Sequence, residues 1–278
     1  NQYSRDFKWN VQSMQSSLPT TLWRHRSLVL ELVKREFSSQ YRGSFGGIFW
    51  SLVQPLFLLT IYIIAFGVIL KSRWNNAGSA ADYAFMLFAG LIIFNAFSEV
   101  LNKSPLLIAR NPNFVKKVVF PLELLPIVTV GVAYLQALLG TAILLAGYIV
   151  FMGKPSPTVL LFPFILLCFS PMLLGLAWLL SAVGVAVKDI GQLTGMLSHC
   201  LLFLTPIFYS MDSAPELLKN LLMLNPLTFI VEQFRLVLLT GGLPSFLGLA
   251  VYTGLASAFS WASLILFRRL RTTFADMV

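Results

Sequence analysis

Residues 36–70 read EFSSQYRGSFGGIFWSLVQPLFLLTIYIIAFGVIL, and this stretch decides the fold. Its first part is polar and basic, whereas residues 45–70 form a run of 26 residues without a charged side chain. A helix of that length spans about 39 Å at roughly 1.5 Å per residue, and the hydrocarbon core of a bilayer is about 30 Å thick. The run therefore predicts a helix that crosses a membrane with some tilt.

The composition of the whole chain points the same way. Of its 278 residues, 57% are hydrophobic and 11% are charged, and the mean hydropathy is +0.80. Soluble domains carry about 25% charged residues, so this is not an ordinary soluble domain. The net charge of +9 does not indicate a nucleic-acid partner, because the positive residues sit at the ends of apolar runs, as they do in membrane proteins.

Five further apolar runs follow the first one. They are residues 83–101, 124–152, a part of 155–187, 190–211 and 246–267. Together with residues 45–70 they predict an all-α membrane protein with six transmembrane helices. Four runs contain single prolines, which a membrane bundle tolerates because neighbouring helices satisfy the freed carbonyls; these are Pro55, Pro126, Pro171 and Pro206.

The first 44 residues are predicted to be a cytoplasmic arm and an amphipathic helix, followed by a transmembrane domain over residues 45–278. From position 22 onward, apolar residues recur at helical spacing. They are Leu22, Val29, Leu30, Val33, Phe37 and Tyr41. Trp23 and the basic residues of the opposite face favour a place in the lipid headgroup region, and packing on a soluble partner is the alternative.

The lysines and arginines predict the orientation, because cytoplasmic loops of membrane proteins are rich in them. With the N-terminus inside, fifteen fall on inner segments: Arg5, Lys8, Arg24, Arg26, Lys34, Arg35, Arg42, Lys103, Arg110, Lys116, Lys117, Lys188, Arg268, Arg269 and Arg271. Five fall on outer segments: Lys71, Arg73, Lys154, Lys219 and Arg235. Both termini are therefore expected in the cytoplasm.

Two connecting segments are predicted to have structure of their own. On the inner side, residues 111–120 alternate aromatic and basic side chains and predict a short helix that Asn113 caps and Pro121 ends. On the outer side, residues 213–239 predict two helices too short to span, which re-enter the outer leaflet. The second carries Glu232 and Arg235, which can pair on one face, and a solvated salt link of about 0–1 kcal/mol is the alternative.

The sequence does not predict a catalytic or metal site. His25 and His199 are far apart and have no acidic residue close by in the sequence. His199, in the fifth run, is either a proton relay or a neutral side chain bonded to a neighbouring helix. Glu99 lies near the inner end of the second run, where its carboxylate can reach water or Lys103.

Four stretches resemble the membrane subunits of polysaccharide ABC exporters, the permeases for O-antigen, capsular polysaccharide and teichoic acid. The first is Tyr41-Arg42-Gly43-Ser44 with Gly47, Trp50 and Pro55. In the same order follow FVKKVVFP at 114–121 with Leu125-Pro126, LTPIFY at 204–209, and LNPL at 224–227 with Glu232 and Phe234-Arg235. Gly46 departs from the family pattern, in which a large aliphatic residue is more common.

This resemblance implies a transport role in a bacterial cytoplasmic membrane. Two copies of the chain would form the pathway, and two separate ATP-binding subunits would hold ATP and magnesium, with no cofactor on this chain. The cargo would be a glycan built on a polyprenyl diphosphate, moved from the inner to the outer side. The implied site residues are Asn113, Phe114, Lys116, Lys117 and Phe120 for coupling to the ATPase, Tyr41, Arg42 and Trp50 at the interface and the start of span one, and Pro206, Tyr209, Asn225, Pro226, Glu232 and Arg235 for an outer gate.

Two other function classes remain open from the residues alone. One is an ABC exporter of a drug or a small lipid. The other is a membrane enzyme acting on polyprenyl-linked sugars, which should carry acidic or histidine clusters at a membrane boundary. The 11 acidic residues are mostly scattered singly, which disfavours the enzyme.

Overall fold

The computed structural model describes residues 21, 23–43, 46–65, 80–116, 120–187, 189–211 and 215–274, and this part of the chain is helical without a strand. Its helices are α3 (Arg26–Gln40), α4 (Trp50–Tyr62), α5 (Ala80–Lys103), α6 (Pro112–Lys116), α7 (Leu124–Met152), α8 (Phe162–Ala186), α9 (Ile190–Leu204), α10 (Glu216–Leu224), α11 (Pro226–Arg235) and α12 (Phe246–Leu270). The expected all-α class is confirmed for these residues.

Within the described residues, four segments are long and apolar enough to cross a membrane. They are Ala81–Leu106, Leu124–Met152, Pro157–Ala186 and Phe246–Leu270. Two further apolar helices, Trp50–Ala65 and Ile190–Leu204, are shorter. They lie in the first and fifth expected spans. Residues 66–70, at the end of the first expected span, and the connection 71–79 lie outside the described part.

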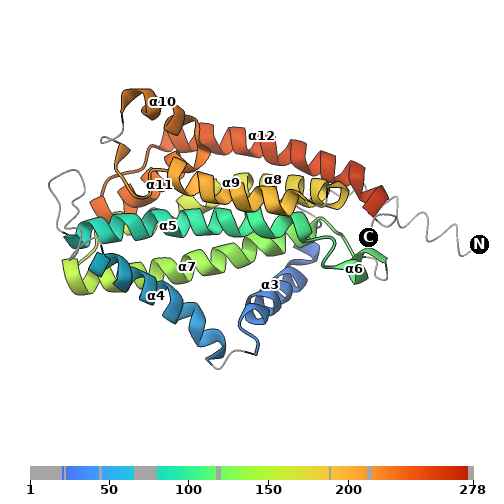
Figure 1. Ribbon diagram of the computed structural model, residues 1–278, viewed down its shortest axis with the longest axis horizontal. Helices are drawn as coiled ribbons and strands as arrows, with labels where there is room; N and C mark the ends of the chain where they lie inside the picture. Colours follow the sequence, from blue (N-terminus) through green and yellow to red (C-terminus); the bar gives the residue numbers. More distant parts are fainter. Residues whose placement is uncertain are drawn as a thin grey trace, which may run out of the picture.

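The long helices lie side by side in one bundle, with α5 running through its middle (Figure 1). Of the four long segments, α5 buries the largest share of its side chains. One apolar cluster joins α5 to α7, α8 and α11, and a second joins α3 to the start of α7 and to the C-terminal parts of α8 and α12. Helices α3 and α6 and the end of α12 lie at one end of the bundle, and α10 lies toward the other (Figure 1).

The expected amphipathic helix is present as α3, and it packs on the bundle of its own chain. Val33 and Phe37, which the helical spacing places on the apolar face, are buried, and so is Leu32, which was not expected there. Val33 meets α7 at Gly131, where an added Cβ would lie 2.7 Å from a Val33 methyl. Leu30, expected on the apolar face, is 62% exposed, and Leu22 lies outside the described residues.

A half-buried cluster of Glu123, Arg268 and Arg271 joins the start of α7 to the end of α12. The Glu123 carboxylate accepts a hydrogen bond from Arg271 at 3.1 Å and lies 3.6 Å from Arg268. Trp178 of α8 donates from its indole nitrogen to the Glu123 carbonyl at 3.1 Å. Three helices are therefore joined around one acidic residue.

The backbones approach closely where α8 passes the 3₁₀ turn that follows α5. A Cβ added to Gly184 would lie 2.0 Å from the Pro105 carbonyl oxygen, so only glycine fits there. Ser181, one turn earlier, donates to the Ser104 carbonyl at 3.1 Å. The small residues of α8 thus bring the two backbones into contact.

We expect Gly184→Ala to lower the thermal stability of the protein, because the contact is with backbone and a side chain cannot move aside. Overpacking of this kind costs about 1–3 kcal/mol or more. The measurement is the unfolding temperature of the purified protein in detergent. Gly254→Ala on α12 is the control, since a Cβ there meets nothing within 4 Å. Equal unfolding temperatures of the two variants would contradict the close packing.

Candidate functional site

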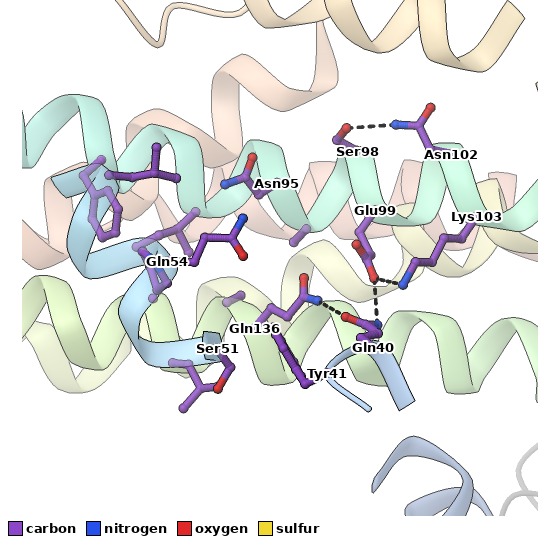
Figure 2. A pocket seen from close by; sticks show the side chains of 18 residues that line it. Gln40, Tyr41, Ser51, Gln54, Asn95, Ser98, Glu99, Asn102, Lys103 and Gln136 are labelled. Atoms are coloured by element: carbon purple, nitrogen blue, oxygen red, sulfur yellow. Dashed lines mark hydrogen bonds and ion pairs between the residues drawn. The ribbon is translucent and has the colours of Figure 1, made fainter. Parts of the chain in front are cut away.

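An open cavity of about 590 Å³ lies among α3, α4, α5 and α7 (Figure 2). Polar side chains from all four segments line it: Gln40 and Tyr41 at the end of α3, Ser51 and Gln54 on α4, Asn95, Ser98, Glu99, Asn102 and Lys103 on α5, and Gln136 on α7. Apolar residues of α4, α5 and α7 form the rest of the wall, Leu58, Phe88 and Leu139 among them. A cavity with so many polar groups is unusual between apolar helices.

Helix α5 contributes half of these polar residues because they follow the helical repeat. Counted from Asn95, they stand at i, i+3, i+4, i+7 and i+8, which places them on one side of the helix. Asn102 donates to the Ser98 hydroxyl at 3.1 Å, and that hydroxyl lies 2.6 Å from the hydroxyl of Ser198 on α9. The stripe therefore borders the cavity and also contacts α9.

A chain of hydrogen bonds crosses the cavity from α7 to α5. Gln136 donates from its amide to Gln40 Oε1 at 2.9 Å, and Gln40 donates from Nε2 to Glu99 Oε1 at 3.3 Å. The same Glu99 oxygen forms an ion pair with Lys103, which is one of the two partners that the sequence allowed. Figure 2 draws the three interactions in a row. The amide of Gln40 thus connects the end of α3 to both α5 and α7.

Two further amides of the cavity have no such partner. Gln54 and Asn95 are exposed to the open space and make no hydrogen bond to the described residues. An amide group in contact with hydrocarbon costs several kcal/mol unless water or another polar group satisfies it. The cavity must therefore hold water or a polar ligand when the protein is in a membrane.

The three residues expected around the start of span one lie at the cavity or beside it. Tyr41 lines the cavity; its partial burial raises the pKa of the phenol, and the charge of Glu99 raises it further, so Tyr41 stays neutral at physiological pH. Arg42 is exposed. Trp50 is 45% exposed, and its indole lies over Gly46, where an added Cβ would be 2.8 Å from Nε1. The small residue that departs from the family pattern thus makes room for this indole.

A smaller cavity of about 220 Å³ adjoins the first and shares Glu99 and Lys103 with it. It is lined in addition by Glu36 of α3 and by Arg110 and Asn111, which follow α5. Acidic and basic side chains are equal in number around it. This second space lies on the side of the cavity that faces α6 and the connection 104–111.

At the other end of the bundle, α9 ends at Leu204, although the sequence predicted a span over residues 190–211. Pro206 has no N–H to continue the helix, and Thr205 before it is extended, with φ −101° and ψ 137°. Residues 205–207 are nonetheless buried. Irregular backbone buried in a membrane bundle needs hydrogen-bond donors from elsewhere.

Side chains supply those donors. Their bonds are Asn225 Nδ2 to the Leu204 carbonyl at 3.2 Å, the Tyr209 hydroxyl to the Phe203 carbonyl at 3.0 Å, and the Tyr83 hydroxyl to the Phe208 carbonyl. Asn225 also begins α11, because its Oδ1 accepts from the Leu227 N–H at 3.0 Å and Pro226 follows as the first helical residue. One asparagine therefore starts one helix and completes the end of another.

Arg235 donates several hydrogen bonds to buried carbonyls of this region. It is 2% exposed and donates to the Pro206 carbonyl at 2.6 Å, the Ile207 carbonyl at 2.9 Å and the Met86 carbonyl at 2.8 Å. Its fourth partner is Glu232 Oε1 at 2.9 Å, so the expected ion pair is present. Because Arg235 is buried, the pair is not the solvated surface link that the sequence also allowed.

The structure places the six expected outer residues in two groups. Pro206, Tyr209, Asn225 and Arg235 meet at the end of α9 through the bonds above, with Pro226 starting α11 beside them. Glu232 remains 39% exposed at the edge of a third cavity, which lies beside α10 and α11. Gly90 of α5 is a further participant, since an added Cβ there would lie 2.6 Å from the Arg235 guanidinium.

The predicted inner helix is present in the described residues, and positions 117–119 lie outside them. It runs over Pro112–Lys116, so proline is its first residue and Asn113 lies inside it; the prediction that Asn113 caps the helix was wrong. Asn113 is exposed, and Phe114 is half-buried with its ring 4.7 Å from that of Phe120. Phe120 is 6% exposed and packs inward. Lys117 lies outside the described residues, and the Lys116 side chain is not described.

Sequence reasoning missed the amide-lined cavity, although one signal for it was available. The stripe from Asn95 to Lys103 repeats at helical spacing within an apolar span, and only Glu99 had been singled out. The contributions of Gln40, Gln54 and Gln136 come from three other helices, so no local pattern connects them. His199, the other ionisable group noted, bonds the Gly195 carbonyl of its own helix at 2.7 Å.

Comparison with known proteins gives this architecture a family. The family model of ABC-2 type transporters matches residues 27–239. The chain belongs to the ABC-2 type transporter family. This ABC-2 chain is similar to the O-antigen export system permease protein RfbA of Myxococcus xanthus, with 26% identity over 259 residues, 92% of this chain and 97% of that protein.

Two other relatives of this ABC-2 chain point in the same direction. The O-antigen export system permease protein RfbA of Klebsiella pneumoniae is 23% identical over 253 residues, which is 90% of this chain and 95% of that protein. The polysialic acid transport protein KpsM of Escherichia coli is 25% identical over 221 residues, 75% of this chain and 81% of that protein. The similarity therefore extends over most of the helices described above.

We expect Arg235→Met to destabilise the protein strongly, because the buried carbonyls of Pro206 and Ile207 lose their donors. Breaking a buried charged network by removing one member costs about 3–5 kcal/mol. The measurement is the unfolding temperature of the purified protein. Arg110→Met, at an exposed position, is the matched control. Unfolding temperatures that agree between the two variants would show that Arg235 does not hold this region together.

Proposed function

We propose that this chain is the membrane-spanning subunit of an ATP-driven exporter that moves a lipid-linked polysaccharide across a bacterial cytoplasmic membrane. The observation that carries the proposal is the match to two polysaccharide export permeases over at least 90% of this chain and 95% of theirs. The polar cavity supports it, because a purely structural membrane protein has no need of unpartnered amides between its helices.

The proposal includes six crossings with both termini in the cytoplasm. Helices α4, α5, α7, α8, α9 and α12 alternate in direction along the bundle (Figure 1). The two short ones are extended at one end by backbone that is not α-helical, such as residues 205–211 after α9. The end of the bundle that carries α3 and α6 receives the segments rich in lysine and arginine. This favours a cytoplasmic location for that end.

The partners would be a second copy of this chain and two ATP-binding subunits, which supply the ATP and magnesium. The short helix α6 supports a docking role, because it projects at the proposed cytoplasmic end with Pro112 and Asn113 exposed. Phe114 of α6 packs against the buried Phe120, and this contact connects α6 to the bundle. A push on α6 would thus reach the inner ends of α5 and α7.

The export role is tested in cells that lack this chain. We expect them to lose surface polysaccharide and to accumulate glycan-loaded polyprenyl lipid, and the wild-type chain should restore both. Surface glycan is measured by flow cytometry and the lipid by extraction and mass spectrometry. Unchanged surface polysaccharide, together with greater sensitivity to a drug, would contradict this function and favour a drug exporter.

Docking of the ATPase is tested at Asn113. We expect Asn113→Arg to reduce co-purification of the ATP-binding subunit about tenfold without lowering the unfolding temperature, because the larger charged side chain projects from the exposed face of α6. Thr272→Arg, also exposed at this end of the bundle, is the control. If Asn113→Arg binds the ATPase as wild type does and export continues, α6 is not the docking element.

An outer gate is proposed for α10 and α11. It is supported by the position of these short helices at the end opposite α6 and by the exposed carboxylate of Glu232 beside an outer cavity.

We expect Glu232→Gln to raise leakage of small solutes from resting proteoliposomes several-fold while folding is retained, because Arg235 keeps its three carbonyl partners. Leakage equal to that of wild type would remove Glu232 from the gate.

A further inference from the structure

The charges of the amide-lined cavity cancel internally. Glu99 and Lys103 are paired with each other, and no other described lining residue of this cavity carries a charge. The remaining polar groups are amides and hydroxyls, which both donate and accept hydrogen bonds. A cavity of this kind suits an uncharged ligand that is rich in hydroxyl groups, and it offers an anion no unpaired cation.

Three amides face the cavity with groups available for such a ligand. Gln54 and Asn95 make no hydrogen bond to the described residues, and Gln136 uses only its nitrogen, in the bond to Gln40. They come from α4, α5 and α7 and surround one space (Figure 2). Donors and acceptors that converge from several helices fix the orientation of a ligand as well as its affinity.

We propose that this cavity binds a neutral pyranose unit of the transported glycan, and this inference rests on the proposed function. The amides would bond the hydroxyls of the sugar, while Pro55, Leu58 and Phe88 contact its C–H face. The volume of about 590 Å³ falls within the roughly 300–1,000 Å³ of small-molecule sites. It leaves space for bridging water beside a single sugar ring.

The geometry disfavours the other parts of a lipid-linked glycan as occupants. An acyl or polyprenyl tail would leave Gln54 and Asn95 unsatisfied, which costs free energy for each buried amide. A phosphate would have to draw Lys103 away from Glu99, leaving a carboxylate with Gln40 as its remaining donor. The exposed cation Arg110 lines the adjoining smaller cavity and not this one.

The test is saturation-transfer NMR on the purified full-length chain in lipid nanodiscs, with methyl α-D-glucopyranoside and methyl N-acetyl-β-D-glucosaminide as probes. Glucose 1-phosphate and glycerol 3-phosphate serve as the charged comparison. We expect signals from at least one neutral glycoside and a loss of at least threefold in the variant Gln54→Leu/Asn95→Leu. Both substituted residues are exposed and take no part in the chain of hydrogen bonds from Gln136 to Glu99. The fold should therefore be retained, and the unfolding temperature checks this.

Gln192→Leu is the matched control, because it removes an exposed amide on α9 that does not line the cavity. Equal signals from wild type and the double variant, signals from the phosphates alone, or no signal from any probe would overturn the inference. Failure of the export function would instead appear as normal surface polysaccharide in cells without the chain. Normal export by the double variant, where wild type restores export, would refute the cavity's role and leave the function in place.

Discussion

The structure depends on how polar groups inside an apolar bundle find hydrogen-bond partners. Arg235 is the clearest case, because one buried guanidinium satisfies carbonyls from α5 and from the broken end of α9. Without it, the backbone after Leu204 would have acceptors buried away from water, each costing a substantial part of the stability of the fold. The glycine at position 90 leaves room for this guanidinium, and the bundle tolerates the break at Pro206 because Arg235 bonds the carbonyls that follow it.

The same constraint has a different outcome at the proposed cytoplasmic end. There the polar side chains of α5 have only some of their hydrogen-bond partners, through the chain of bonds from Gln136 to Lys103. An open cavity remains beside them. A closed network stabilises a bundle, whereas a partly open one provides a place for water or a ligand. The two ends of the bundle therefore differ: polar groups are closely bonded around Arg235 at one end, and an open cavity lies toward the other. Such an asymmetry suits a transporter that takes up cargo at one side.

Much of the fold could be predicted from the sequence, because it depends on local patterns. Long apolar runs gave α5, α7, α8 and α12 to within a few residues at most ends. The end of α9 was missed, because whether a proline breaks a helix depends on which donors stand nearby, and Arg235 is 29 positions from Pro206. The pairing of Glu232 with Arg235 was predictable from their spacing, but the burial of Arg235 was not. The cavity was missed for the same reason, since its amides come from four separate helices.

The polar side chains on one side of α5 line a cavity that must hold water at membrane depth. A spin label at Asn95→Cys, in a chain whose own cysteines at 168 and 200 are replaced by alanine, measures this directly. In lipid bilayers, its collision rate with a water-soluble nickel chelate should be high and that with oxygen low, while a label at the exposed Leu255 of α12 should show the reverse. Equal behaviour of the two labels, with oxygen dominant at both, would mean that Asn95 faces lipid and that the cavity does not exist in the membrane.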